Sequence, residues 1–135
     1  MAVHRGERSM SQQVVQEYIR RNNTADVEGL LALMTPDHAF CVDGEPPLSG
    51  AEALREASKG YCAAYHTYTI YVDEIYDQHE RVIVVGHTSG SHLPASIEQK
   101  PSSVLWEARL RDGRIATWII YYPTTPEIRQ LFHLP

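Results

Sequence analysis

The stretch that decides the fold is residues 102–122, SSVLWEARLRDGRIATWIIYY. At its centre, Asp112-Gly113 is a pair typical of two-residue β-hairpin turns, because both positions of such turns need positive φ angles. Apolar, β-branched and aromatic residues crowd both sides of this pair, as they do in strands. The sequence therefore predicts an antiparallel hairpin with strands at 102–111 and 114–122.

Alternation along the strand 102–111 indicates which side chains share a face, because successive side chains in a strand point to opposite sides. One face carries Val104, Trp106, Ala108 and Leu110, and the other carries Leu105, Glu107, Arg109 and Arg111. The second face is mostly charged. We expect Glu107 and Arg109 to form an ion pair there, on the surface.

The strand 114–122 is apolar on both faces, and a strand of this kind needs cover on both sides. One face carries Ala116, Trp118, Ile120 and Tyr122, and the other carries Ile115, Thr117, Ile119 and Tyr121. We expect one face to look into a cavity capped by helices. The other face is expected to pack against a second subunit, which makes the chain a homodimer.

Two helices are predicted near the N-terminus, each from apolar residues at helical spacing. The first spans about 10–22 and begins at a capping box formed by Ser9 and Gln12. The second is marked by apolar residues within 27–34 and is stopped by Thr35-Pro36, because the residue before a proline is disfavoured in a helix.

A short strand at 39–43 and a third helix follow. The helix is predicted to begin at a capping box of Ser49 and Glu52. Its buried positions recur at three- and four-residue steps, at Leu54, Ala57, Tyr61 and Tyr65.

From Tyr68 onward the apolar period changes from 3.6 to 2, which predicts strands at 68–76 and 81–88. A polar loop interrupted by prolines is expected at 93–101, and Thr125-Pro126-Glu127 is expected to open a short final helix. The order α-α-β-α-β-β-β-β indicates a single α+β domain over residues 11–135. Residues 1–10 are read as a disordered tail, with Met10 as an alternative start.

Composition excludes several classes of function. The chain has 135 residues and a formal net charge of −5 without a basic block, which argues against nucleic acid as a partner. No apolar run is long enough to span a membrane, and the N-terminus has no apolar core of a signal peptide. Cys41 and Cys62 are expected to be buried free thiols, which fits a reducing cytoplasm.

Several segments resemble known families. Gln16-Glu17-Tyr18-Ile19, the run 26–31, Phe40-Cys41-Val42-Asp43 and the loop 46–50 resemble the first half of the ketosteroid isomerase family. The hairpin and the run 118–122 are similar to the closing hairpin of a wider superfamily. That superfamily includes nuclear transport factor 2, SnoaL-like polyketide cyclases, scytalone dehydratase and limonene epoxide hydrolase.

The resemblance covers roughly residues 11–132 and implies a cystatin-like α+β barrel. Its curved antiparallel or mixed sheet would form a cone around a long N-terminal helix, with two further helices. The mouth of such a cone admits a small, mostly apolar ligand.

The resemblance also implies roles for two residues. Asp43 falls at the position of the isomerase family's general base, and Tyr18 falls at the phenol that donates a hydrogen bond to the developing enolate. Trp106 falls where that family keeps a protonated acid as a second donor, so steroid isomerisation in the strict sense is not expected. Asp43 could instead begin a turn, and Tyr18 could be a core tyrosine.

Histidines offer an alternative base. Scytalone dehydratase has two histidines with tyrosines that polarise a carbonyl, and His66 and His92 fall near those places. No spacing typical of a zinc site is present, and no cofactor is expected. The residues predicted to line the pocket are Val14, Leu54, Tyr61, Tyr65, His66, His92, Trp106 and Tyr122.

Three hypotheses about function follow. The first is a cofactor-free isomerase, cyclase or dehydratase that uses Asp43 as a general base on a small apolar carbonyl compound. The second is a binding domain that holds a small apolar metabolite without chemistry. The third is a dimeric interaction module with a filled pocket. An Asp43 carboxylate inside a closed apolar cavity would favour the first.

Overall fold

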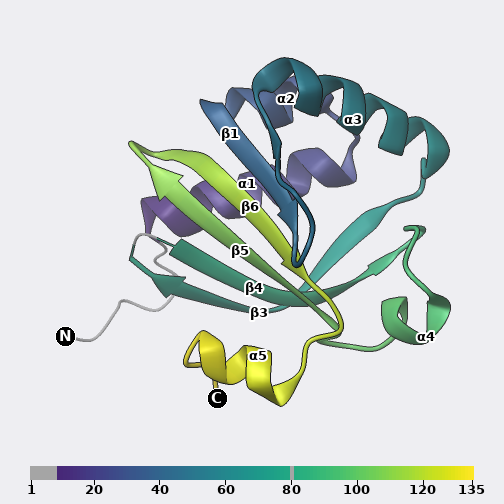
Figure 1. Ribbon diagram of the computed structural model, residues 1–135, viewed down its shortest axis with the longest axis vertical. Helices are drawn as coiled ribbons and strands as arrows, with labels where there is room; N and C mark the ends of the chain where they lie inside the picture. The colour runs from purple at the N-terminus through teal and green to yellow at the C-terminus, as the bar shows by residue number, and fades with distance from the viewer. Residues whose placement is uncertain (1–8, 80) are drawn as a thin grey trace.

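The computed structural model describes residues 9–79 and 81–135, which form one curved sheet with helices on both sides (Figure 1). The helices are α1 (Met10–Asn23), α2 (Val27–Ala32), α3 (Ala51–Ala64), α4 (Ala95–Glu98) and α5 (Pro126–Leu131). The strands are β1 (Met34–Val42), β2 (Leu48–Ser49), β3 (Thr69–Gln78), β4 (Arg81–Ser89), β5 (Val104–Arg111) and β6 (Arg114–Tyr121). The predicted α+β class is confirmed.

The sheet is mixed, with strand order β2-β1-β6-β5-β4-β3. β1 runs parallel to β6, and the other neighbours are antiparallel. The predicted hairpin joins β5 to β6, and its turn residues Asp112 and Gly113 have φ angles of 53° and 76°. These positive angles are the ones that two-residue hairpin turns require. The predicted hairpin is thus confirmed, and its strands β5 and β6 lie in the middle of the sheet.

The concave face of the sheet packs on α1, which buries Val15, Tyr18 and Ile19. Val104, Trp106 and Ala108 of β5 lie in this core, whereas Leu105 belongs to a second cluster. The face alternation predicted for β5 is thus confirmed. Figure 1 shows α1, α2 and α3 on one side of the sheet and α5 on the other.

The opposite face is covered in part by the chain itself. Phe132, directly after α5, is buried against Ile83, Val85 and Leu105. The sequence assigned the cover of Ile115, Thr117, Ile119 and Tyr121 to a second subunit, but the C-terminal segment covers Tyr121, whose ring centroid lies 5.4 Å from that of Phe132. Ile115 does not share this face, because the pairing of β5 with β6 shifts beside it and Ile115 is buried in the concave core. The homodimer stays a prediction.

The predicted surface ion pair on this face is wrong in one respect. Arg109 is exposed, but the side chain of Glu107 has 0% of its surface accessible. Its carboxylate accepts hydrogen bonds from Arg109 Nε at 2.9 Å, Arg81 at 3.4 Å and the Tyr121 hydroxyl at 3.4 Å. Residues distant in sequence bury this acid, so strand alternation alone could not reveal it.

Three local predictions need correction. β1 begins at Met34 rather than at residue 39, and its pairing with β6 shifts between Met34 and Ala39. Pro36 lies in this irregular stretch, where a missing N–H is tolerated, so it marks no break before the strand. Ser49 does not cap α3, because it lies in β2 and pairs there with Ala39 of β1. The N-cap of α3 is Gly50, which has no side chain to accept a hydrogen bond. The expected loop at 93–101 contains the short helix α4.

Two predicted helix starts are confirmed. Ser9 Oγ accepts a hydrogen bond from Gln12 N at 3.0 Å, and Thr125 caps α5 with Pro126 at its first position. Of the predicted tail, residues 1–8 lie outside the described residues, and Met10 is already helical. Among the described helices, none is both long enough and apolar enough to cross a membrane.

A buried histidine makes the stability of the fold depend on pH. His38 is completely buried, and its Nδ1 lies 2.9 Å from the Ile115 carbonyl, which can only accept, so Nδ1 carries the proton. Nε2 has no partner among the described residues. Burial lowers the pKa of His38, because a second proton would place an unpaired charge in the core.

We expect the free energy of unfolding to fall as the pH drops below about 6.5, the ordinary histidine pKa. In that range the unfolded chain binds a proton at His38 that the folded chain does not bind. Urea unfolding of wild type and His38→Gln between pH 7 and 5 tests this, since the variant lacks the titrating group. Equal slopes of stability against pH in the two proteins would contradict it.

Candidate functional site

An apolar cavity of about 480 Å³ lies between α1, α3 and the concave face of the sheet. Among the described residues that line it, none is Asp, Glu, Lys or Arg. Eight of them are aromatic: Tyr18, Phe40, Tyr61, Tyr65, Tyr68, Trp106, Trp118 and Tyr122. Such a surface suits an uncharged ligand, because an ion would lose its hydration without gaining a counter-charge.

Most of the predicted pocket residues lie on this cavity: Tyr18, Leu54, Tyr61, Tyr65, His92, Trp106 and Tyr122. Two do not. Val14 packs against the core behind the wall, and His66 is exposed just after α3. Cys62 was predicted to be a buried free thiol; it is half-buried and lines the cavity.

Asp43 lies apart from the cavity. It is exposed in the turn after β1 and is not a lining residue. Phe40 and Val42 line the cavity, so strand alternation turns Cys41 and Asp43 to the other face. The pKa of Tyr121, which lies on that other face, is consistent with this placement. Burial raises it to about 12, and the nearby carboxylates of Glu107 and then Asp43 add to the shift. The structure therefore does not bring Asp43 and Tyr18 to one site.

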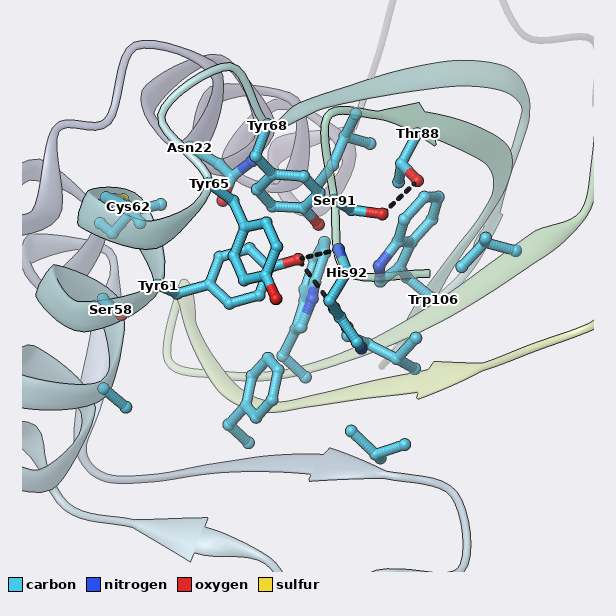
Figure 2. Close-up of a pocket in the computed structure, with 18 of the residues that line it drawn as sticks. Asn22, Ser58, Tyr61, Cys62, Tyr65, Tyr68, Thr88, Ser91, His92 and Trp106 are labelled. Atoms are coloured by element: carbon cyan, nitrogen blue, oxygen red, sulfur yellow. Dashed lines mark hydrogen bonds between the residues drawn. The ribbon is translucent and has the colours of Figure 1, made fainter. Parts of the chain in front are cut away.

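A histidine–tyrosine pair lies at the cavity mouth. The Tyr61 hydroxyl is 2.9 Å from Nδ1 of His92 and accepts a hydrogen bond from the His92 backbone N–H at 3.2 Å (Figure 2). Tyr61 comes from α3, and His92 from the loop after β4. When the shared proton is on Nδ1, Nε2 carries a lone pair and can act as a base. When the proton is on Tyr61, Nε2 of the neutral ring carries a proton and is a hydrogen-bond donor.

Glu98 of α4 holds the loop that carries His92. Its carboxylate accepts hydrogen bonds from the Ser91 backbone N–H at 2.7 Å, the Thr88 hydroxyl at 3.0 Å and the Ser91 hydroxyl. Partial burial on its own would raise the pKa of Glu98, but the bonds from Ser91 and Thr88 outweigh it and lower the pKa. Glu98 is therefore a stable anionic anchor beside the cavity.

The tyrosines deeper in the cavity are neutral. Burial raises the pKa of Tyr18, and burial followed by the phenols of Tyr61 and Tyr18 raises that of Tyr68. Neutral phenols can donate hydrogen bonds to an acceptor on a ligand. Tyr18 also packs on Trp118, with ring centroids 4.4 Å apart.

Sequence reasoning missed several polar groups of the site. Asn22, Tyr68, Thr88 and Ser91 line the cavity, and Glu98 stands behind it. Figure 2 shows Asn22, Tyr68, Thr88 and Ser91 around the cavity, with the hydrogen bond between Thr88 and Ser91 drawn. Tyr68 lies two residues before Ile70, so strand alternation from Ile70 could have predicted that Tyr68 faces the cavity. The contact between Ser91 and Glu98 could not be predicted in this way, because the loop that contains them has no repeating pattern of apolar residues.

Comparison with known proteins agrees with this fold. The sequence profile of the SnoaL-like domain matches residues 15–118. No curated protein matches the chain in sequence. A candidate polyketide cyclase from Sinorhizobium meliloti is 21% identical, with a TM-score of 0.67 over 80% of this chain and 93% of that one.

Two further solved structures are similar. A candidate SnoaL-like polyketide cyclase from Shewanella putrefaciens is 14% identical, with a TM-score of 0.71 over 96% of this chain and 90% of that one. SalBIII, an epoxide hydrolase/cyclase-like enzyme of pyran ring formation in salinomycin, is 18% identical, with a TM-score of 0.68 over 83% and 89%. At these identities the structures establish the fold alone. Because the profile match spans most of the sequence, the chain belongs to the SnoaL-like domain family of the nuclear transport factor 2-like superfamily.

Proposed function

We propose that the chain is a small-molecule enzyme that binds a neutral, largely apolar carbonyl compound and moves protons on it with its own side chains. The observation that carries this proposal is the 2.9 Å contact between Tyr61 and His92 on the wall of a cavity without charged side chains. Membership in a family with cyclase-like members supports an enzyme-type function.

His92 would act as the base. With the shared proton on Nδ1, its Nε2 takes a proton from the carbon next to the carbonyl. The electron pair of the broken C–H bond forms a C=C bond, and the π pair of the C=O bond moves onto the oxygen. The proton now on His92 can return to another carbon if the enolate is conjugated with a C=C bond, or it can protonate a β-hydroxyl that leaves as water. Alternatively, the enolate carbon attacks a second carbonyl, whose oxygen takes up that proton. These outcomes correspond to an isomerase, a dehydratase and a cyclase. Tyr18, a neutral phenol of the cavity wall, is the proposed donor to the oxygen.

Asp43 is the competing base. A carboxylate is a suitable base for this chemistry, but Asp43 is exposed and lies on the face of β1 opposite to the cavity. A base must come within hydrogen-bond reach of the proton that it removes. We therefore assign the role to His92.

A non-catalytic binding domain is the alternative function, because the same cavity could hold an apolar metabolite without chemistry. The exposure of His92 at the mouth favours it, since a solvated base gains no reactivity from burial. Deuterium exchange into a bound ketone separates the two functions.

A homodimer, the other proposal from the sequence, would use the half-buried Ile119 and Tyr121 on the opposite face.

We expect the cavity to discriminate against charge. 1-Indanone should bind at least about 100-fold more tightly than indane-1-carboxylate, a molecule of similar size, because the described residues of the cavity offer no cation to the carboxylate. Calorimetric titration at pH 7.5 measures both dissociation constants. Equal affinity for the two compounds would show that the site provides a positive partner, and the proposal of a neutral substrate would fail.

A further inference from the structure

Helix α3 is packed more loosely than α1, the other long helix of the cavity wall. It has 14 residues but buries only Leu54, whereas α1, of the same length, buries Val15, Tyr18 and Ile19. Its inward side chains border the cavity itself: Leu54, Ala57, Ser58, Tyr61 and Cys62. Segments with few buried apolar contacts open at a low cost in free energy. Of the two long helices, α3 is therefore the one that can leave the cavity more easily.

The polar contacts between α3 and the rest of the chain lie at the surface. Arg55 Nε donates to the carboxylate of Glu28 in α2 at 2.8 Å, but the side chain of Glu28 is 65% exposed. Exposed ion pairs of this kind contribute little stability. Tyr61 contacts His92, which is exposed as well. Figure 1 shows α3 at the outer edge of the molecule, beside α2. Breaking these contacts would leave the packing of α1 on the sheet intact.

The two ends of α3 have the backbone of a hinge. Gly50, just before the helix, has φ 93° and ψ 148°, a conformation that essentially only glycine adopts. Its N–H donates to the His38 carbonyl of β1 at 3.0 Å, so this residue is attached to the sheet. A Cβ at Gly50 would meet no described atom within 4 Å, which leaves room for rotation. At the other end, Tyr65 leaves the helix with φ −127° and ψ 65°. Hinges commonly consist of a few such residues at the ends of an element.

We propose that α3 is a movable wall of the cavity, which turns about Gly50 and Tyr65 to admit a ligand and packs onto the ligand once it is bound. The inference rests on the proposed function only for the ligand, a neutral and largely apolar molecule. It adds a step that precedes any chemistry. Because Tyr61 belongs to α3 and contacts His92, closure of α3 also restores the contact that orients the base.

Thiol labelling measures the opening of α3. Cys41 and Cys62, the two cysteines of the chain, are replaced by Ser so that a single new thiol reports. Leu54→Cys places that thiol on α3 and Val15→Cys places it on α1, at positions that are 3% and 0% exposed. The reagent, 5,5′-dithiobis(2-nitrobenzoate), carries two negative charges, which the closed apolar cavity does not accommodate. We expect Leu54→Cys to react at least about tenfold faster than Val15→Cys, because only α3 opens locally.

Urea separates this local opening from unfolding of the whole chain. A local opening exposes little surface, so labelling of Leu54→Cys should be nearly constant up to about 1 M urea, whereas labelling of Val15→Cys should rise steeply. 1-Indanone at about 100 times its dissociation constant should slow labelling of Leu54→Cys at least about tenfold, because bound ligand holds α3 closed. Equal rates and equal urea dependence in the two variants, or labelling of Leu54→Cys that bound ligand leaves unchanged, would overturn the inference.

Two glycines test the position of the hinge. Gly50→Ala in the Leu54→Cys protein should speed labelling about five- to fiftyfold, because alanine strains the closed conformation. Gly44→Ala is the matched control, since Gly44 also has a positive φ, 84°, and open space at its Cβ, but lies in the turn after β1. The control should stay within about twofold. Equal acceleration by both substitutions, or none by Gly50→Ala, would show that α3 does not turn about Gly50.

The wild-type chain allows a measurement without any substitution. ¹⁵N relaxation dispersion reports motion on the microsecond to millisecond scale, in which hinged walls usually open and close. We expect dispersion in the backbone amides of α3 and not in those of α1, and saturating 1-indanone should suppress it. Equal dispersion in the two helices, or none in either, would contradict the movable wall.

The two proposals can fail separately. If α3 opens and 1-indanone closes it but exchanges no deuterium, the movable wall stands and the catalytic function fails. If the ketone exchanges deuterium while labelling and relaxation show no opening of α3, the function stands and the movable wall fails.

Discussion

His92→Gln is expected to slow the exchange of deuterium from D₂O into the carbon next to the carbonyl of 1-indanone by about 10²- to 10⁴-fold, the usual contribution of a general base. Glutamine keeps a hydrogen-bonding side chain of similar length but cannot take up a proton at neutral pH. Binding of the ketone should be retained, because His92 is exposed at the cavity mouth and contributes little apolar wall. Proton NMR of the ketone measures exchange without knowledge of the natural substrate.

Matched variants identify the base. Tyr61→Phe should cost less, about ten- to a hundredfold, because it removes the group that orients His92 but leaves the imidazole. Asp43→Asn and His66→Gln should stay within about twofold of wild type, since neither side chain lines the cavity. Loss of exchange in Asp43→Asn with full exchange in His92→Gln would show that the carboxylate is the base and that our assignment is wrong.

The sequence predicted the elements whose signals are local. The turn pair Asp112-Gly113, the alternation along β5, and the caps Ser9 and Thr125 each depend on a few neighbouring residues, and the structure has all of them. The aromatic wall of the cavity follows from the same alternation, with Trp106 and Tyr122 on the inward side. Local rules of this kind work because backbone geometry alone decides which face a side chain takes.

The rest depends on contacts between distant segments. Tyr61 and His92 meet across 31 residues, and α4 is too short to show a helical period before it brings Glu98 to Ser91. Pro36 was read as the end of a helix, although it lies within an irregular strand. Asp43 was selected by resemblance, whereas the alternation from Phe40 to Val42 directs it away from the cavity. Alternation within the strand was the better guide here.

The second large effect is expected on the face opposite to the cavity. Replacing both Arg81 and Arg109 by Met should lower the free energy of unfolding by about 3–5 kcal/mol, because Glu107 would remain as a buried carboxylate without a cation. Arg109→Met alone should cost about 1 kcal/mol, since Arg109 is 59% exposed and Arg81 remains beside the acid. Urea unfolding at constant pH gives the free energies of unfolding of the wild type, the double variant and Arg109→Met.

A third substitution tests the cause. Adding Glu107→Leu to the double variant should restore most of the lost stability, because an apolar side chain in this buried position needs no partner. Loss of packing by the arginine side chains would not be reversed in this way, so a triple variant as unstable as the double one would contradict the argument. Ketone binding should be unchanged in every variant that folds, since Glu107 and Trp106 point to opposite faces of β5. Glu107, Arg81 and Arg109 would then stabilise one face of the sheet, while the other face is left free for an uncharged ligand.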